Sequence, residues 1–379
     1  MLSVFIFILI LSFLVIIHEL GHFLIARKHG VKVNEFGLGY PPKALTLFTA
    51  FGTPFTLNWI PFGGFVRLEG EDGPELGTEQ KETHKSEREF FRVAVWQKLS
   101  IVLAGPIVNF IFGIIAFSIV FSVTGIPQQL VGQARIEQIM PGSPAQLAGL
   151  EKGSNIIGFI TADSVRTQTP GIKDVQAFVA AHKGETVTVI TSPVCVGVAC
   201  AEAELTRELY LRKDSEIPEG QGSIGVIFSD YYLQRYPWYL MPLYGSWYGL
   251  KQAVQLGFMM VQALGMVVSN LFTGGGVSAD VAGPIGIVHQ AQKSNILSSG
   301  WMMALSFAGM LSINLAIMNI LPIPALDGGR AFFIVLGGLI GQKRIEKIEN
   351  YANYGGFIAL IGLIVLISLR DIHRIIQGG

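Results

Sequence analysis

Two histidines and a glutamate lie close together in the sequence His18-Glu19-Leu20-Gly21-His22, near the end of the first apolar stretch. On a helix, residues four positions apart lie one above the other, so both imidazoles can bind one zinc ion. Glu19 lies about 100° round the helix from His18, beside such a metal, where it can take a proton from a water molecule. The pattern is short and also arises by chance on soluble helices, but ionisable residues inside an apolar segment are costly and usually functional. The sequence therefore predicts a zinc site with a general base next to it.

Tetrahedral zinc bound by two histidines needs a third protein ligand, with the fourth position open for water. The carboxylate at the end of another apolar run is Asp327, in a segment from Asn319 to Gly329 that contains two prolines and two glycines. Prolines break helices, and a broken helix at membrane depth is tolerated where it lines a polar cavity. The alternative is that Asp327 only caps a helix starting at Gly328. Asp371 is a weaker candidate for the third ligand, because it lies past the last apolar run among arginines.

The composition is that of a membrane protein. Half of the 379 residues are hydrophobic, only 14% are charged, and the net charge is zero. Soluble domains carry about a quarter charged residues, so the composition argues against an ordinary soluble enzyme and against a disordered chain, and neutrality argues against nucleic-acid binding. The first apolar run has no basic start and no small-residue cleavage site, which disfavours a signal peptide. Four runs are long enough to cross a hydrocarbon core of about 30 Å: residues 1–26, 99–124, 301–326 and 350–369.

The positive charges predict which side of the membrane each segment occupies. Residues 27–98 hold ten Lys and Arg, whereas the much longer segment 125–300 holds eleven. Basic residues concentrate in cytoplasmic loops, so the first segment is predicted to be cytoplasmic and the second to lie outside. Lys343, Arg344 and Lys347, between the last two runs, agree with this topology. Arg370 and Arg374 disagree, because four crossings leave the C-terminus outside.

The long outer segment is predicted to contain a small β-rich domain at residues 132–231. Short β-type runs, such as 186–190 and 204–211, are separated by Pro-Gly and Lys-Gly turn signals. The only two cysteines of the chain, Cys195 and Cys200, fall in this domain. Their spacing leaves open whether they form a disulfide or stay as two thiols.

Residues 243–272 could either cross the membrane or lie on its surface. The segment is mostly uncharged, but two of its glutamines are seven positions apart and share one helical face. The depth at which the predicted zinc ligands lie in the membrane favours a surface position for residues 243–272. His18 and His22 lie toward the cytoplasmic end of the first run, and Asp327 reaches that end only if the run at 301–326 enters from outside. An additional crossing would place the ligands tens of ångströms apart, at about 1.5 Å per residue.

Taken together and in order, these motifs resemble the site-2 protease family of intramembrane zinc metalloproteases, and specifically its bacterial RseP-type branch (regulator of sigma-E protease). Residues 18–22 match the zinc motif of that family, and residues 319–328 match its N-x-x-P-x-P-x-L-D-G segment. Pro141-Gly-Ser-Pro-Ala145, followed by Ala148-Gly-Leu150, resembles part of a PDZ domain. The remaining matches are residues 36–39 and 60–67 in the loop after the first helix, and residues 96–99 and 104–109 in the second helix.

The resemblance implies that His18, His22 and Asp327 bind zinc and that Glu19 is the catalytic base, in agreement with the prediction from the residues themselves. It implies an α-helical membrane protein with four transmembrane helices, one PDZ-like α+β domain outside the cytoplasm and a β-rich loop on the cytoplasmic side. Some relatives carry two PDZ domains, but residues 132–231 have room for only one.

The implied activity is the hydrolysis of peptide bonds within or near transmembrane segments, in the bacterial inner (cytoplasmic) membrane. The implied partners are the lipid bilayer and single-pass proteins already cut once by another protease, such as anti-sigma factors, or signal-peptide remnants; no nucleic acid is expected. A zinc-binding scaffold that acts through its PDZ domain is one alternative, and Glu19 argues against it because a scaffold needs no base. A zinc transporter is the other, and the uncharged second and fourth runs argue against that.

A transmembrane substrate must unwind locally before hydrolysis, because its peptide bonds are locked in helical hydrogen bonds. The loop at 31–68 alternates β-type runs with glycines, and an exposed edge there could hold the unwound strand by β-addition; an ordinary hairpin is the alternative. Gly63 and Gly64 in this loop are candidates for positioning the substrate. Asn319 is a third candidate, either as a hydrogen-bond donor to the substrate or as a residue of helix packing.

Overall fold

The computed structural model describes residues 2–70, 89–130, 132–193, 204–218, 220–273, 283–293, 296 and 299–376. The chain divides into two compact units, one formed by Met1–Val123 with Pro242–Gly379 and the other by Thr124–Met241. Cys195 and Cys200 lie outside the described residues, so the question of their disulfide stays open.

Within the described residues of the first unit, four helices are long and apolar enough to cross a membrane, in agreement with the four predicted runs. They are α1 (Leu2–Lys28), α2 (Val95–Thr124), α7 (Trp301–Ile320) and α9 (Gln342–Ile376). Helix α7 ends six residues before the end of its apolar run. Leu321 is extended because it precedes Pro322, which disfavours helical backbone at that position. The next helix, α8 (Asp327–Ile340), begins after this break.

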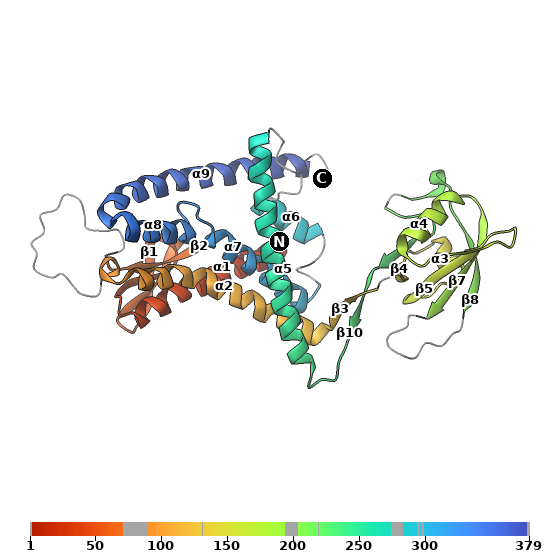
Figure 1. Cartoon of the computed structure of the whole chain (residues 1–379), viewed down its shortest axis with the longest axis horizontal. Coiled ribbons are helices and arrows are strands. Elements are labelled where there is room, and N and C mark those ends of the chain that lie inside the picture. The colour runs from red at the N-terminus through yellow and green to blue at the C-terminus, as the bar shows by residue number, and fades with distance from the viewer. Residues whose placement is uncertain are drawn as a thin grey trace, which may run out of the picture. The chain divides into compact units, whose positions relative to one another are not determined.

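Helices α1, α2 and α7 run side by side and pack through small residues (Figure 1). A Cβ atom on Gly21 of α1 would lie 2.7 Å from the carbonyl oxygen of Ala104 in α2, and one on Gly113 of α2 would overlap Ile313 of α7. Lipid tails are as apolar as leucine, so helices in a bilayer associate through close packing of this kind rather than through the hydrophobic effect. The small residues thus set the separation of the three helices.

Between α1 and α2 the chain forms a long antiparallel hairpin of β1 (Val33–Ala50) and β2 (Thr53–Leu68), followed by a short 3-10 helix, η1 (Phe90–Arg92). The two turn residues, 51 and 52, have φ values of 57° and 78°, the backbone of a tight hairpin turn. The hairpin packs on α1 through aromatic rings. The ring of Phe23 in α1 lies 5.8 Å from that of Phe36 and 5.5 Å from that of Phe55. The β-rich loop expected from the sequence is thus a hairpin attached to the first helix.

The hairpin folds back on itself, so that β1 pairs with β2 twice. Phe36 is opposite both Phe55 and Val66, and Leu38 is opposite both Leu57 and Gly64. The first half of β1 therefore lies between two parts of β2. The last part of β2, residues 64–67, forms one edge of this small sheet, since β2 pairs only with β1 among the described strands.

Helix α5 (Met241–Thr273) contacts α2 through two glycines. Cβ atoms on Gly245 and Gly249 would overlap Ser122 and Ser118 of α2. Figure 1 shows α5 lying across the direction in which α2 runs. Although it has 33 residues, α5 is not among the four described helices that are apolar enough to cross a membrane.

Helix α6 (Pro284–Lys293) is held by the end of α9. The carboxylate of Asp371 accepts hydrogen bonds from the backbone N–H groups of Gly283, at 3.0 Å, and Gly286, at 2.8 Å. These bonds satisfy donors in the first turn of α6 that have no partner within the helix. Asp371, the weaker candidate for the third ligand, thus bonds the start of α6 and is not part of the cluster formed by His18, His22 and Asp327.

The second unit is a β-rich domain. Its elements are β3 (Ile126–Gln129), β4 (Ala134–Ile139), α3 (Pro144–Leu147), β5 (Ser154–Ile160), β6 (Arg166–Gln168), α4 (Ile172–Ala181), β7 (Thr186–Pro193), β8 (Leu205–Tyr210), η2 (Asp214–Glu216), β9 (Val226–Ser229) and β10 (Tyr231–Gln234). An antiparallel sheet has the strand order β8-β7-β5-β4-β9, with β6 also paired to β5, and a separate two-stranded ribbon joins β3 to β10. Phe178 of α4 stacks on Phe159 of β5, with ring centroids 4.4 Å apart, at the centre of the core.

Candidate metal centre

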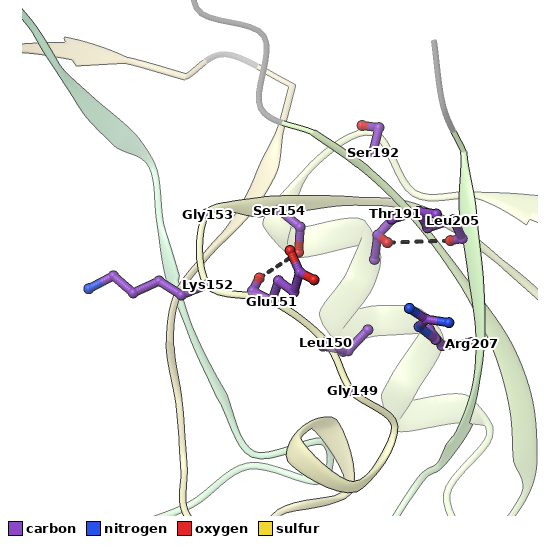
Figure 2. A pocket seen from close by; sticks show the side chains of 10 residues that line it. All are labelled: Gly149, Leu150, Glu151, Lys152, Gly153, Ser154, Thr191, Ser192, Leu205 and Arg207. Carbon is purple, nitrogen blue, oxygen red and sulfur yellow. Dashed lines mark hydrogen bonds between the residues drawn. The ribbon is translucent and has the colours of Figure 1, made fainter. Parts of the chain in front are cut away.

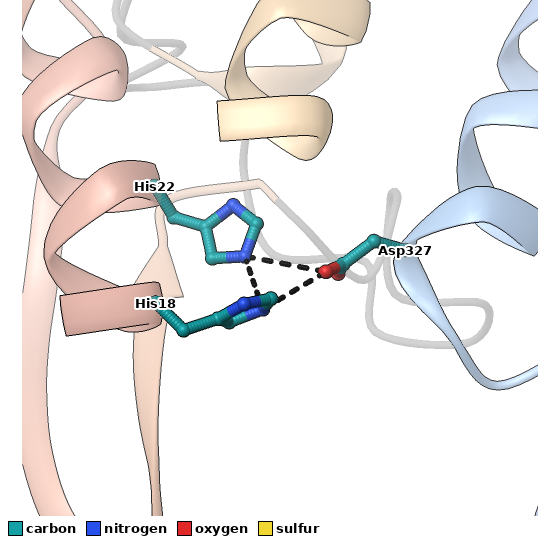
Figure 3. Close-up of side chains that lie close together, drawn as sticks. All are labelled: His18, His22 and Asp327. Atoms are coloured by element: carbon teal, nitrogen blue, oxygen red, sulfur yellow. Dashed lines mark hydrogen bonds and ion pairs between the residues drawn. The ribbon is translucent and has the colours of Figure 1, made fainter. Parts of the chain in front are cut away.

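Helix α1 carries His18 and His22 one turn apart on one face. Their Nε2 atoms lie 3.1 Å apart and their ring centroids 4.8 Å apart. Both side chains point away from α1 toward the start of α8 (Figure 3). The helical spacing thus brings two ligand nitrogens to one point. This point is shielded from solvent, since His18 is only 8% exposed.

The break between α7 and α8 brings Asp327 to the same point. Its Oδ2 atom lies 3.0 Å from Nε2 of His18 and 3.5 Å from Nε2 of His22. The break is tight, because Cβ atoms on Gly328 and Gly329 would overlap the backbone of residues 320–324. Asp327 is the first residue of α8 and Leu326 is the N-cap, with no side-chain capping bond. The helix thus begins at Asp327 itself, one residue before the start at Gly328 that the capping alternative assumed.

The geometry of these three residues fits zinc. Within the described chain, His18, His22 and Asp327 each offer one ligand atom, and these atoms lie within 4.8 Å of one another. Two ligands about 2.0–2.1 Å from a tetrahedral zinc ion are about 3.3 Å apart, close to the observed separations of 3.0–3.5 Å. Oδ2 of Asp327 is buried without a hydrogen-bond donor. Lone pairs facing one another at such distances repel unless a cation lies between them, so the donor set suits a divalent metal.

Helix α2 forms the wall behind the two histidines. Nδ1 of His22 donates a hydrogen bond of 2.8 Å to the carbonyl oxygen of Ile101, which leaves Nε2 free to face the site. A Cβ atom on Gly105 would lie 2.7 Å from Nε2 of His18 and would overlap His22. Neither residue was predicted from the sequence as part of the site. The available signal was the run of Ala, Gly and Pro at 104–106, since small residues inside a membrane helix mark close contacts.

The last part of β2 lies against Glu19. A Cβ atom on Gly64 would lie 3.4 Å from Cγ of Glu19, while one on Gly63 would overlap the ring of Tyr40. Burial raises the pKa of the Tyr40 phenol, and the negative charge of Glu19 raises it further. Of the two glycines predicted to position substrate, Gly64 thus lies next to the candidate base, and Gly63 packs against the ring of Tyr40.

Asn319, the remaining predicted residue, lies in the last turn of α7 and is half-buried. It stands eight positions before Asp327 on the other side of the proline break. The cluster formed by the three candidate ligands does not include it.

The second unit has a pocket of its own, shown in Figure 2. It is lined by the turn at residues 149–154 together with residues of β7 and β8. The Ser154 hydroxyl donates to the backbone oxygen of Glu151 at 2.7 Å, and the Thr191 hydroxyl donates to that of Leu205 at 3.3 Å. Glu151 is the only acidic residue among the lining residues, and none of them is His or Cys. The pocket therefore lacks the donors of a metal site.

Known proteins are similar to this chain along most of its length. The family model Peptidase_M50, peptidase family M50, matches residues 6–363. A protein of Mesorhizobium japonicum is 28% identical over 335 residues, which cover 86% of each chain. Proteins of Clostridium acetobutylicum and Helicobacter pylori are each 30% identical, over 89% and 86% of this chain and 87% of the relative. All three carry the name "Putative zinc metalloprotease".

Proposed function

The chain belongs to peptidase family M50, the site-2 protease family of zinc-dependent membrane proteases, and we propose that it hydrolyses peptide bonds within or near the transmembrane segments of other membrane proteins. The convergence of His18, His22 and Asp327 beside Glu19 carries this proposal. The four apolar helices support its placement in a bilayer. A scaffold or a transporter would not need a base beside the metal.

In this proposal each residue of the centre has one task. His18, His22 and Asp327 hold zinc, which when bound polarises a substrate carbonyl and acidifies a water molecule. Glu19 takes a proton from the attacking water and gives it to the leaving amine. Its position fits that task, because it neighbours His18 in sequence but projects from a different side of α1, toward Gly64.

The edge of β2 supports a way of holding the substrate. Residues 64–67 form an edge of the small sheet, and Gly64 lies against Glu19. An unpaired edge can accept a further strand through backbone hydrogen bonds. We place the unwound part of the substrate along this edge, where extended backbone passes close to the base. Asn319 stays a candidate for donating a hydrogen bond to the substrate.

The predicted topology places the hairpin on the cytoplasmic side of a bacterial inner membrane and the β-rich second unit outside, as a PDZ-like domain. The crosswise run of α5 and its absence from the candidate spans support a surface position for residues 243–272. Because the second unit connects α2 to α5, we propose that it excludes substrates with bulky external domains and admits trimmed ones. Binding of a substrate's new C-terminus by the same domain is the rival hypothesis.

The test uses the full chain purified in detergent, with zinc content and cleavage of a model transmembrane peptide as separate readouts. Alanine at His18, His22 or Asp327 should lower bound zinc and abolish cleavage. Glu19→Gln should abolish cleavage while zinc stays bound. His29→Ala is the matched control, because His29 lies three residues past the same apolar stretch and bonds Ser100 at 2.8 Å instead of the cluster.

The outcomes separate the candidate functions. Full zinc content and cleavage in Asp327→Ala would remove that residue from the ligand set. Cleavage by Glu19→Gln at the wild-type rate would show that Glu19 is not the catalytic base. Zinc binding without any cleavage by the wild-type protein would favour the scaffold, and zinc uptake into vesicles would favour the transporter.

A further inference from the structure

A polar side chain lies fully buried behind His18. Asn109, in the middle of α2, is 0% exposed. Its side-chain nitrogen Nδ2 lies 3.3 Å from Nδ1 of His18. Its side-chain oxygen Oδ1 is buried without a hydrogen-bond partner among the described residues. An amide placed in an apolar helix with half of its bonding capacity unused needs an explanation.

Stabilisation of the helix packing does not supply one. The hydroxyl of Ser312 in α7 donates a 2.7 Å hydrogen bond to the backbone oxygen of Asn109, so this contact between helices would form with any side chain at position 109. A buried amide with one unpaired end is destabilising relative to an apolar side chain of the same volume. The Asn109 side chain therefore acts through its one partner, His18.

The chemistry of the site decides which atom of the amide faces His18. A histidine binds zinc through a nitrogen without a proton, and the Nε2 atom of His18 faces Asp327 at 3.0 Å. The proton of the neutral ring must then be on Nδ1, which needs an acceptor. His22 follows the same rule, since its Nδ1 donates to the carbonyl oxygen of Ile101. The oxygen and nitrogen of an asparagine amide are assigned from such partners, and a half-turn of the Asn109 amide exchanges Nδ2 for Oδ1 opposite Nδ1 of His18.

We propose that Asn109 is a positioning residue of the zinc centre, whose side-chain oxygen accepts the Nδ1–H of His18 and holds Nε2 toward the metal. This proposal rests on the zinc site proposed above. It makes α2 the source of both acceptors behind the histidines, a backbone carbonyl for His22 and a side-chain carbonyl for His18. Hydrogen bonds of this kind fix the orientation of the ring and raise the basicity of the ligand.

The experiment measures zinc affinity by chelator competition on the full chain in detergent, with cobalt absorption as a second readout. Asn109→Leu removes the acceptor at similar volume and should weaken zinc about 10–100-fold. Asn109→Asp keeps an acceptor oxygen and should bind zinc at least as tightly as the wild type, with a wild-type cobalt spectrum. Ser312→Ala is the control, because it removes the neighbouring bond to the backbone of Asn109 and should leave zinc affinity unchanged.

Rescue by aspartate distinguishes an acceptor from simple packing. Wild-type zinc affinity in Asn109→Leu would overturn the proposal, and so would an Asn109→Asp protein as weak as Asn109→Leu. If the leucine variant shows no cooperative unfolding, the aspartate variant decides alone: tight binding supports the acceptor role and loss of binding overturns it. His18→Ala is run in parallel, because wild-type affinity in that protein would refute the zinc site itself rather than the role of Asn109.

Discussion

Gly105 provides a sharp test of the proposed metal centre, because it contacts the candidate ligands without being one of them. A Cβ atom at this position would lie 2.7 Å from both Nε2 and Cε1 of His18, and closer still to Nε2 of His22. Comfortable contact between such atoms needs about 3.5 Å, so Gly105→Ala must move the His18 ring by about 0.8 Å or push α1 away from α2. Either movement displaces the ligand nitrogens from the site.

The displacement is large for a metal site. Ligand distances are held within about 0.2 Å, and a misplacement of about 1 Å can cost about 100-fold in activity. We expect Gly105→Ala to weaken zinc binding by about 100-fold and to reduce cleavage at least as much. The helix itself should tolerate the change, since Ala is favoured over Gly by up to about 1 kcal/mol in a helix interior. Chelator competition and peptide cleavage measure the two effects, and thermal unfolding checks the fold.

Gly113→Ala is the matched control. It lies two turns further along α2, and its Cβ atom would overlap Ile313 of α7 rather than a ligand. It should disturb the packing of α2 on α7 and leave zinc affinity close to the wild-type value. If Gly105→Ala bound zinc and cleaved peptide like the wild-type protein, the arrangement of α2 behind the histidines would be wrong.

Three further predictions test the substrate edge, the topology and the second unit. Gly64→Val should reduce cleavage while zinc content stays unchanged, and unchanged cleavage would argue against substrate at this edge. In a chain without its native cysteines, a reagent added from outside should label cysteine at Asp174 and Lys293 but not at Arg67; labelling of Lys293 only from the cytoplasm would show that α5 crosses the membrane. Replacement of residues 132–231 by a flexible linker should make untrimmed substrates cleavable, whereas loss of trimmed substrates would favour a docking role.

Much of the first unit could be predicted because its signals are local. Uncharged length alone finds the four long helices, and the spacing of His18 and His22 alone puts both on one face. Asp327 required one non-local step, the requirement that it reach the depth of the histidines, and the structure does bring it there. The prolines at 322 and 324 marked the break, although the run of apolar residues hid the end of α7 at Ile320.

The residues behind the ligands could not be found in this way. A membrane helix is apolar on the side that faces lipid and on the side that faces its neighbours, so the sequence of α2 gives no periodic signal for which face meets α1. The roles of Gly105 and Asn109 become visible only when the rotation of α2 about its own axis, and hence the face it turns toward α1, is known. The double pairing of β1 was hidden for a different reason: a strand with glycines and prolines specifies its register weakly, and folding back depends on bends at particular residues.

Different helices of the proposed centre supply the metal ligands and the groups that orient them. In the proposed zinc centre, α1 and the start of α8 supply the ligand atoms. Helix α2 supplies no ligand and orients both rings through the carbonyl of Ile101, the amide of Asn109 and the bare backbone at Gly105. Helices in lipid have no hydrophobic effect to press them together, so their separation depends on close contacts such as that of Gly21 with Ala104. The same contact that packs α1 on α2 therefore sets how near the two imidazoles come to the groups that orient them. Helix packing and metal geometry are one constraint at this point of the chain.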